Sequence, residues 1–189
     1  MGASPCGFKS HLAHMTDDFR RVVTAVDGEG HSVVDSDGPP PVVISPRHPD
    51  QFLTAIWTVD ELPTSYTAPG DRDGFRLSPP GGGVNIIRNK LPPDSMVYVD
   101  ADGQPRPVAD DENLHRTATV DFICVLEGEL WLVLEGDDDV HLQAGDCVVQ
   151  RGTIHAWRNR TDEPTTFLAV LIDADESTLP AAPIGPEAL

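Results

Sequence analysis

Short apolar runs separated by turn residues make up most of the chain, and helical periodicity is scarce. Apolar runs bounded by Gly, Pro, Asn or Asp are typical of β-strands. A possible helical turn lies around residues 11–21. About ten strands with almost no helix indicate an all-β sandwich or barrel. The pattern predicts strands over residues 21–26, 31–35, 52–60, 84–89, 96–100, 120–126, 130–135, 140–142, 146–150, 155–159 and 166–173.

The chain has 189 residues, enough for one compact domain with a tail at either end. Residues 1–16 are predicted to be a flexible extension, residues 17–174 a single barrel domain, and residues 175–189 an extended, proline-containing tail. Residues 27–30 read Asp-Gly-Glu-Gly between two Val-rich runs and predict a hairpin. Residues 38–49 are interpreted as a surface connection.

The chain carries 31 Asp and Glu against 13 Lys and Arg, a formal net charge of −18. This charge repels phosphate backbones and anionic lipids, and no basic patch offsets it. No apolar run approaches the roughly 20 residues that a membrane-spanning helix needs. The first residues lack the apolar core of a secretory signal. We therefore predict a soluble, cytoplasmic protein that binds neither nucleic acid nor membranes.

The three cysteines, Cys6, Cys124 and Cys147, contain no Cys-x-x-Cys pair. An odd count without such a pair argues against a structural zinc site and against a disulfide scaffold. We therefore predict that all three are free thiols. The His11-x-x-His14 pair near the start of the chain is interpreted as a solvated pair.

The last third of the chain carries the candidate chemistry. Side chains alternate between the two faces of a strand, so His115, Thr117 and Asp121 are predicted to share one face. By the same rule, His155 and Trp157 share a face of a later strand. If the barrel brings these faces together, His115, Asp121 and His155 surround one point. Two imidazoles and a carboxylate suit Fe(II), Mn(II), Zn(II) or similar ions, with positions left open for substrate or water.

Two stretches of this region resemble the motifs of the cupin family. In the first motif, a His-x-His pair is followed by an acidic residue and then a glycine, and residues 113–128 are similar to its latter part. The second motif has a glycine followed later by Pro-x-Gly-x2-His-x3-Asn. Its counterparts here are Gly145 as the leading glycine, Gln150 in place of the proline, and Gly152, His155 and Asn159.

The resemblance covers residues 114–174 and implies a cupin-type double-stranded β-helix, or jelly-roll, barrel with extra N-terminal strands. It implies a homodimer, with the N-terminal strands extending one sheet or crossing to a partner subunit. On the residues, it implies that His115, Asp121 in place of the family's Glu, and His155 hold one divalent ion: Fe, Mn, Zn or Ni. Thr117 stands where the family has its second His, which leaves three protein ligands.

We expect a metal-dependent enzyme that acts on a small oxygenated organic molecule, the ion serving as a Lewis acid in a dehydration, decarboxylation or isomerisation. Asp121 and Thr117 are the candidate catalytic residues, with Asp121 moving a proton when it is not a ligand of the ion. Gln150, Trp157 and Thr117 are the candidate substrate-binding residues. All of these are predicted to line a pocket inside the barrel.

Alternatives stay open at this point. The same ligands suit a non-haem Fe(II) dioxygenase, and a non-catalytic small-molecule sensor would use the same pocket without metal. At the level of single residues, His115 is also consistent with an exposed edge position and Asp121 with a residue that orients a ligand histidine. Trp157 is also consistent with a core position.

Overall fold

The computed structural model describes residues 19–40, 43–44, 48, 50–74, 76–136 and 139–178. The predicted N-terminal extension, both residues of the His11-x-x-His14 pair, Cys6 and most of the predicted C-terminal tail lie outside these ranges. The strands are β1 (Arg21–Val26), β2 (Ser32–Gly38), β3 (Val43–Ile44), β4 (Phe52–Val59), β5 (Val84–Leu91), β6 (Thr119–Glu127), β7 (Glu129–Leu134), β8 (Val140–Gln143), β9 (Cys147–Arg151), β10 (His155–Arg158) and β11 (Thr165–Asp173).

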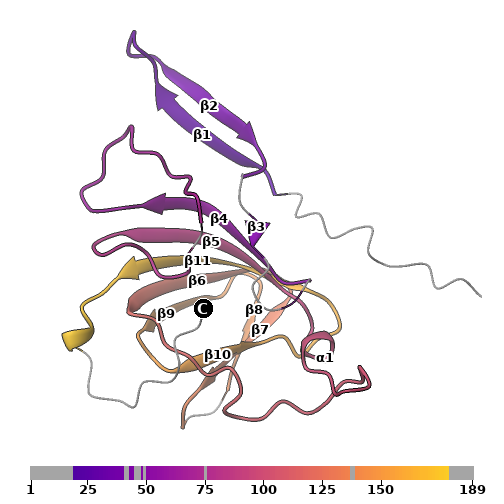
Figure 1. The fold of residues 1–189 in the computed structure, drawn as a ribbon. Helices are drawn as coiled ribbons and strands as arrows, with labels where there is room; N and C mark the ends of the chain where they lie inside the picture. The colour runs from indigo at the N-terminus through magenta and orange to yellow at the C-terminus, as the bar shows by residue number, and fades with distance from the viewer. Residues whose placement is uncertain are drawn as a thin grey trace, which may run out of the picture.

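Two antiparallel sheets form the barrel (Figure 1). The larger has six strands in the order β3-β4-β5-β11-β6-β9, and the smaller has three in the order β10-β7-β8. Their inner faces bury one hydrophobic core, so the all-β prediction is confirmed. The core comprises Leu53, Ile87, Ile123, Val125, Leu130, Leu132, Leu142, Phe167, Ala169 and Leu171.

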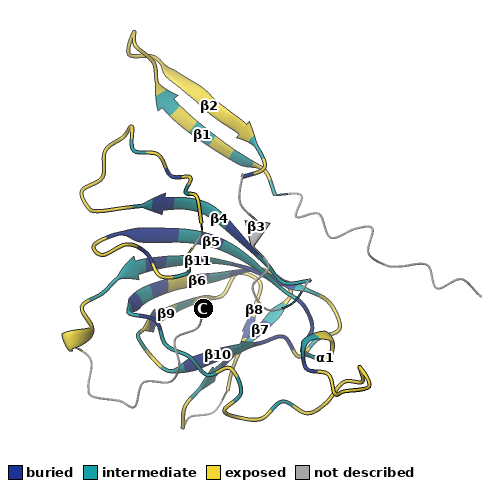
Figure 2. Ribbon diagram, viewed as in Figure 1, coloured by how far each residue is buried: buried dark blue, intermediate teal, exposed yellow. Residues whose placement is uncertain are grey.

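The predicted hairpin at residues 27–30 joins β1 to β2, and these two strands form a separate sheet. They project from the barrel and extend neither of its sheets (Figure 1). Most of β2 is exposed (Figure 2). The base of the hairpin is attached by Arg21, which binds Asp71 at 2.5 Å and donates to the Ile56 carbonyl at 3.0 Å. Of the strands in the N-terminal half, β3, β4 and β5 extend the larger sheet as expected, whereas β1 and β2 form an arm beside the barrel.

Three predicted segments differ in detail from the structure. Residues 96–100 do not form a strand, because Pro92 and Pro93 lead into the short helix α1 (Asp94–Val97), whose first turn carries Asp94. The predicted connection at residues 38–49 contains the two-residue strand β3. The start of the predicted C-terminal tail forms a 3-10 turn, η1 (Glu176–Thr178). Among the described residues, no helix is both long and apolar enough to cross a membrane.

Gly128 is the corner at which the chain leaves the larger sheet at β6 and enters the smaller sheet at β7. Its φ of +78° lies in the left-handed region, which favours glycine. Thr165, at the start of β11, closes the corner by donating from Oγ1 to the Glu129 carbonyl at 2.6 Å. A Cβ on Gly128 would lie 2.9 Å from Thr165 Oγ1 and 3.1 Å from Thr165 Cα.

We expect Gly128→Ala to lower the free energy of unfolding by about 2–4 kcal/mol, because it adds a steric conflict to an unfavourable φ. Gly136→Ala is the matched control, since Gly136 has a similar φ of +83° but nothing within 4 Å of an added Cβ. That variant should lose only about 1–2 kcal/mol. Urea denaturation measures both values, and equal losses would contradict the packing argument.

Candidate functional site

The inward face of β6 and of the segment before it carries polar side chains at alternate positions. Thr117, Thr119 and Asp121 are buried, and His115 is half-buried. The hydroxyl oxygens of Thr117 and Thr119 lie 2.6 Å apart in a hydrogen bond. The outward-facing Phe122 is 47% exposed, so the predicted alternation is confirmed. With Gln150 and His155, these side chains form what we call the inner polar cluster: His115, Thr117, Thr119, Asp121, Gln150 and His155.

Strand β9 brings Gln150 into this cluster because Asp121 and Gln150 are paired in the β6–β9 ladder. Gln150 Nε2 lies 3.5 Å from Asp121 Oδ2, a long contact, and 2.8 and 3.1 Å from the two ring nitrogens of His155. The residue that replaces the motif's proline therefore points into the site. Its amide lies against both the carboxyl group of Asp121 and the imidazole of His155.

His115 and His155 are brought together by an isolated antiparallel bridge. Their backbone N–H groups donate to each other's carbonyls at 2.8 and 2.9 Å, and their ring centroids lie 4.3 Å apart. The sequence prediction that these two histidines converge is thus matched by the geometry.

Each ring is oriented by a backbone carbonyl two residues earlier. His115 Nδ1 lies 2.9 Å from the Asn113 carbonyl, and His155 Nδ1 lies 3.0 Å from the Thr153 carbonyl. A carbonyl only accepts, so Nδ1 carries the proton and Nε2 carries the lone pair in both rings. In this tautomer Nε2 is the ring nitrogen of His155 that can accept from the Gln150 amide, whose nitrogen lies 3.1 Å from Nε2 and 2.8 Å from the protonated Nδ1. These two carbonyls are site features that the sequence reasoning missed, because they belong to the backbone.

Burial sets the protonation states of the cluster. It raises the pKa of Asp121 to about 6, with a smaller opposing effect from a hydrogen bond with Thr119. It lowers the pKa of His155 to about 3, with a smaller contribution from the nearby His115. At neutral pH, His155 is therefore a neutral imidazole and Asp121 is largely a carboxylate close to its titration point.

The donor types of the inner polar cluster suit a divalent ion. Neutral imidazole nitrogens and a carboxylate are suitable ligands, and a second hydrogen bond through Nδ1 is how proteins orient metal-binding histidines. Asp121 Oδ1 is buried with no hydrogen-bond partner among the described residues. As they stand, no three His, Cys, Asp or Glu side chains in the described ranges are grouped closely enough to hold one ion. An ion at His155 Nε2 would replace the hydrogen bond from Gln150.

Trp157 lies beside the cluster and also belongs to the core. Its ring meets His155 edge-on, with centroids 5.5 Å apart, and packs against Phe167 at 5.7 Å. It is partly buried against the main hydrophobic cluster. Trp157 therefore forms the boundary between the core and the inner polar cluster.

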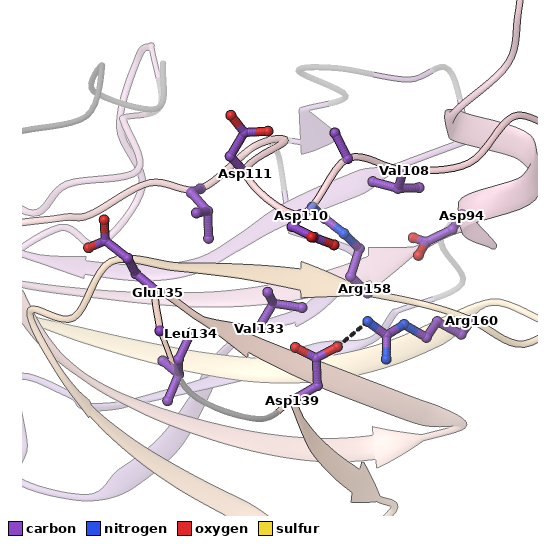
Figure 3. Close-up of a pocket in the computed structure, with 13 residues that line it drawn as sticks. Asp94, Val108, Asp110, Asp111, Val133, Leu134, Glu135, Asp139, Arg158 and Arg160 are labelled. Carbon is purple, nitrogen blue, oxygen red and sulfur yellow. Dashed lines mark hydrogen bonds and ion pairs between the residues drawn. The ribbon is translucent and has the colours of Figure 1, made fainter.

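The sequence predicted a pocket inside the barrel, lined by the candidate site residues. The two best-defined pockets of the structure lie elsewhere. The larger, of about 950 Å³, lies between residues 108–114 and strands β7 and β10 (Figure 3). It contains Arg158 and an ion pair between Arg160 and Asp139. The smaller, of about 410 Å³, is lined by residues 118–120, 151–152 and 174–178. Only the smaller shares a residue, Thr119, with the inner polar cluster.

Two residues next to the site have structural roles that the sequence reasoning did not assign. Asn159, the last residue of the second motif, is fully buried, and its side chain binds Leu91, Thr161 and Glu163. Arg158 is only 3% exposed, and its guanidinium binds the Glu112 carbonyl and the Tyr98 hydroxyl. Asparagine and arginine side chains are usually exposed, so the sequence did not indicate that these two would be buried.

The family profile described as Cupin domain (Cupin_2) matches residues 97–171, which contain the whole inner polar cluster. The chain belongs to the cupin superfamily. Among solved structures, this cupin is similar to the cupin domain of Cnp3 from Schizosaccharomyces pombe, with 9% identity and a TM-score of 0.42 over 82% of this chain and 87% of that one.

Named relatives of this cupin come from fungi. It is 35% identical over 147 residues to Phomopsin biosynthesis cluster protein C' of Diaporthe leptostromiformis, covering 75% of this chain and 70% of that protein. It is 58% identical over 45 residues to Oryzines biosynthesis cluster protein J of Aspergillus oryzae, covering 24% and 25% of the two chains. It is 39% identical over 62 residues to a cupin-domain-containing oxidoreductase, srdB, of Neurospora crassa, covering 32% of each.

Proposed function

We propose that this cupin is an enzyme of small-molecule biosynthesis in which His115 and His155 hold one divalent metal ion, with Asp121 either as the third ligand or, when it is not a ligand, as the proton-transfer group. The observation that carries the proposal is a buried carboxyl group of pKa about 6 that contacts the same Gln150 amide as a neutral, oriented histidine. Structural barrels fill such positions with apolar side chains, because an unpaired buried carboxyl group destabilises the fold.

Asp121 is suited to take up and return a proton near neutral pH. A general base works best when its pKa lies close to the working pH, and burial places Asp121 there. Its Oδ1 has no hydrogen-bond partner among the described residues, so that lone pair is available to a substrate C–H or O–H group. Thr117, Gln150 and Trp157 then bind the substrate, Thr117 and Gln150 by hydrogen bonds and Trp157 as an apolar wall.

His115 and His155 would hold the ion through Nε2, because Nδ1 of each is hydrogen-bonded to a carbonyl. When bound, the ion supplies Lewis acidity toward a substrate carbonyl or carboxylate oxygen. Asp121 removes the proton that this polarisation makes acidic. Dehydration and isomerisation of small oxygenated molecules use this combination, and decarboxylation uses the Lewis acid together with a proton delivered to the carbanion that is left when CO2 departs.

Substrate entry is best assigned to the smaller pocket. Thr119 lines this pocket and also hydrogen-bonds to Thr117 within the inner polar cluster. The turn η1 forms part of the opposite wall. Thr119 also hydrogen-bonds to Asp121, so it links this pocket to the inner polar cluster.

A second candidate function is oxidation of the substrate with dioxygen, which the name of the Neurospora crassa relative favours. The same histidines and carboxylate suit an Fe(II) site. The two functions differ in their need for oxygen, so assays under air and under argon separate them. The predicted homodimer and cytoplasmic location also stay predictions, which chromatography with light scattering and cell fractionation would test.

Metal content tests the ligand assignment. After reconstitution with Fe(II), Mn(II), Zn(II) or Ni(II), we expect near-stoichiometric metal by mass spectrometry for the wild type, and affinity at least about 100-fold weaker for His155→Ala. The control is His141→Ala, because His141 lies outside the cluster, where it binds Glu129. Metal-free wild type under all four conditions, or equal metal in both variants, would contradict the assignment.

Hydrogen exchange tests the chemistry. Small ketones and keto acids with acidic C–H bonds should incorporate deuterium in D2O under argon when the wild type is present, as followed by NMR. Asp121→Asn should slow this exchange by about 10²–10⁴-fold, the usual contribution of a general base. Exchange unaffected by Asp121→Asn would contradict its role. Turnover that requires air would favour the oxidative alternative.

A further inference from the structure

The outer face of the β6–β9 pair carries two cysteines directly opposite each other. Cys124 of β6 and Cys147 of β9 are partners in the ladder, and both are free thiols. They point away from the barrel interior, because the alternate residues of β6, Ile123 and Val125, are the buried ones. The prediction of free thiols is confirmed for these two residues. Their proximity was not predicted, because it results from the pairing of β6 with β9.

The register places their side chains as close as antiparallel strands allow. Val125 N donates to the Asp146 carbonyl at 3.0 Å, one residue after Cys124 and one before Cys147. This is the pattern of a non-hydrogen-bonded pair, in which opposite Cα atoms are about 4.5 Å apart and side chains are closest. Disulfides form at Cα separations from about 4.4 Å upward. The backbone therefore already has the spacing that a disulfide requires.

The two thiols contact each other and are reachable from solvent. A hydrogen bond with the Cys147 thiol raises the pKa of Cys124, so the sulfurs face one another. Their other contacts are long ones of 3.9 Å, from Cys124 to the Val125 carbonyl and from Cys147 to the Gly145 carbonyl. Cys147 is exposed and Cys124 is half-buried, so a small oxidant meets Cys147 first.

We propose that Cys124 and Cys147 are a redox-sensitive dithiol that closes to a cross-strand disulfide on reaction with a low-molecular-weight disulfide such as oxidised glutathione. The Cys147 thiolate attacks one glutathione sulfur, and the first reduced glutathione leaves. The Cys124 thiolate then attacks the Cys147 sulfur of the mixed disulfide, and the second leaves. The protein gives up two electrons and two protons, and both appear in the two glutathione thiols.

The disulfide would stabilise the strand pair on which the inner polar cluster depends. Strand β9 lies at the edge of the larger sheet and is hydrogen-bonded only to β6 among the described strands. The pair Asp121 and Gln150 lies three residues along the same ladder from the two cysteines. Closing the loop between Cys124 and Cys147 restricts the unfolded chain, so oxidation should raise Tm by roughly 5–10 °C.

Redox titration of the full chain tests the proposal independently of any catalytic assay. Protein equilibrated with mixtures of reduced and oxidised glutathione is quenched with N-ethylmaleimide, and its disulfides are located by peptide mass spectrometry. We expect a Cys124–Cys147 link in the wild type and in Cys6→Ser. In Cys147→Ser, we expect only a glutathione adduct on Cys124.

Three outcomes would overturn the proposal. They are separate glutathione adducts on Cys124 and Cys147 with no link between them, links between chains only, and thiols that stay reduced in oxidised glutathione. A Tm that rises on oxidation of the wild type but not of Cys147→Ser would support it. Because Cys147 is exposed, serine at this position should leave the fold intact.

Discussion

Replacing Asp121 with asparagine should make the free energy of unfolding of the metal-free protein rise with pH between about 4 and 6 more steeply than that of the wild type, by about 1.4 kcal/mol per pH unit. In the wild type, burial raises the pKa of Asp121 from 3.8 to about 6. The folded state therefore holds this proton more tightly than the unfolded chain. Its stabilising effect is complete below pH 3.8 and is lost as the pH rises through 6, a change of up to about 3 kcal/mol.

His155 acts in the opposite direction over an overlapping range. Burial lowers its pKa from 6.5 to about 3, so the unfolded chain takes up a proton that the folded state refuses. Its stabilising effect is complete above pH 6.5 and is lost as the pH falls toward 3, a change of up to about 5 kcal/mol. Between pH 4 and 6, the contributions of Asp121 and His155 to the pH dependence of the free energy of unfolding nearly cancel in the wild type. The Asp121→Asn variant keeps only the contribution of His155.

Urea denaturation at several pH values, with a chelator present, measures these slopes. His155→Asn should show the opposite change, with stability falling by about 1.4 kcal/mol per pH unit over the same range relative to the wild type. The double variant should restore the wild-type slope, because other titrating groups are common to all four proteins. Parallel curves for the four proteins would show that neither group has a shifted pKa.

Replacing Asn159 with alanine should lower the free energy of unfolding by about 3–5 kcal/mol. Asn159 is fully buried, and its Nδ2 donates to the carbonyls of Leu91 and Glu163 at 3.1 and 2.8 Å. Its Oδ1 accepts from the N–H and the hydroxyl of Thr161 at 3.1 and 2.7 Å. Truncation leaves these groups without partners at the turn between β10 and β11.

Thermal and urea unfolding measure this loss, and Thr161→Val is the matched control. That variant removes the hydroxyl but keeps the Asn159 amide and its two carbonyl acceptors, so it should cost only about 1 kcal/mol. A loss below 1 kcal/mol for Asn159→Ala would mean that water replaces the amide. The motif asparagine would then need an explanation other than the stability of this turn.

Some elements of the site follow from local pattern. The spacing of His115, Thr117 and Asp121 placed them on one face because the period of an extended strand is set by the backbone alone. The same rule placed His155 and Trp157 together. In β6 the burial of alternate residues agrees with the prediction, whereas in β10 His155, Ala156 and Arg158 are all buried.

Other features had no local signal. Strands β6 and β7 follow each other in sequence but belong to different sheets, because the chain turns at Gly128 against Thr165 on a distant strand. Residues 96–100 have the apolar pattern of a strand, yet they have no neighbouring strand beyond a single bridge from Val99 to Pro105. Pairing partners are distant in sequence, so an apolar run does not reveal whether one is present.

The sequence by itself determined the all-β class, the cupin motifs and the face on which each candidate residue lies, because these depend on side-chain period and residue spacing. Only the tertiary structure decided that Gln150 meets Asp121 and His155, that the two histidine rings are oriented by the Asn113 and Thr153 carbonyls, and that Cys124 faces Cys147. These contacts depend on strand register, which is set by packing across the whole barrel and by residues far apart in the chain.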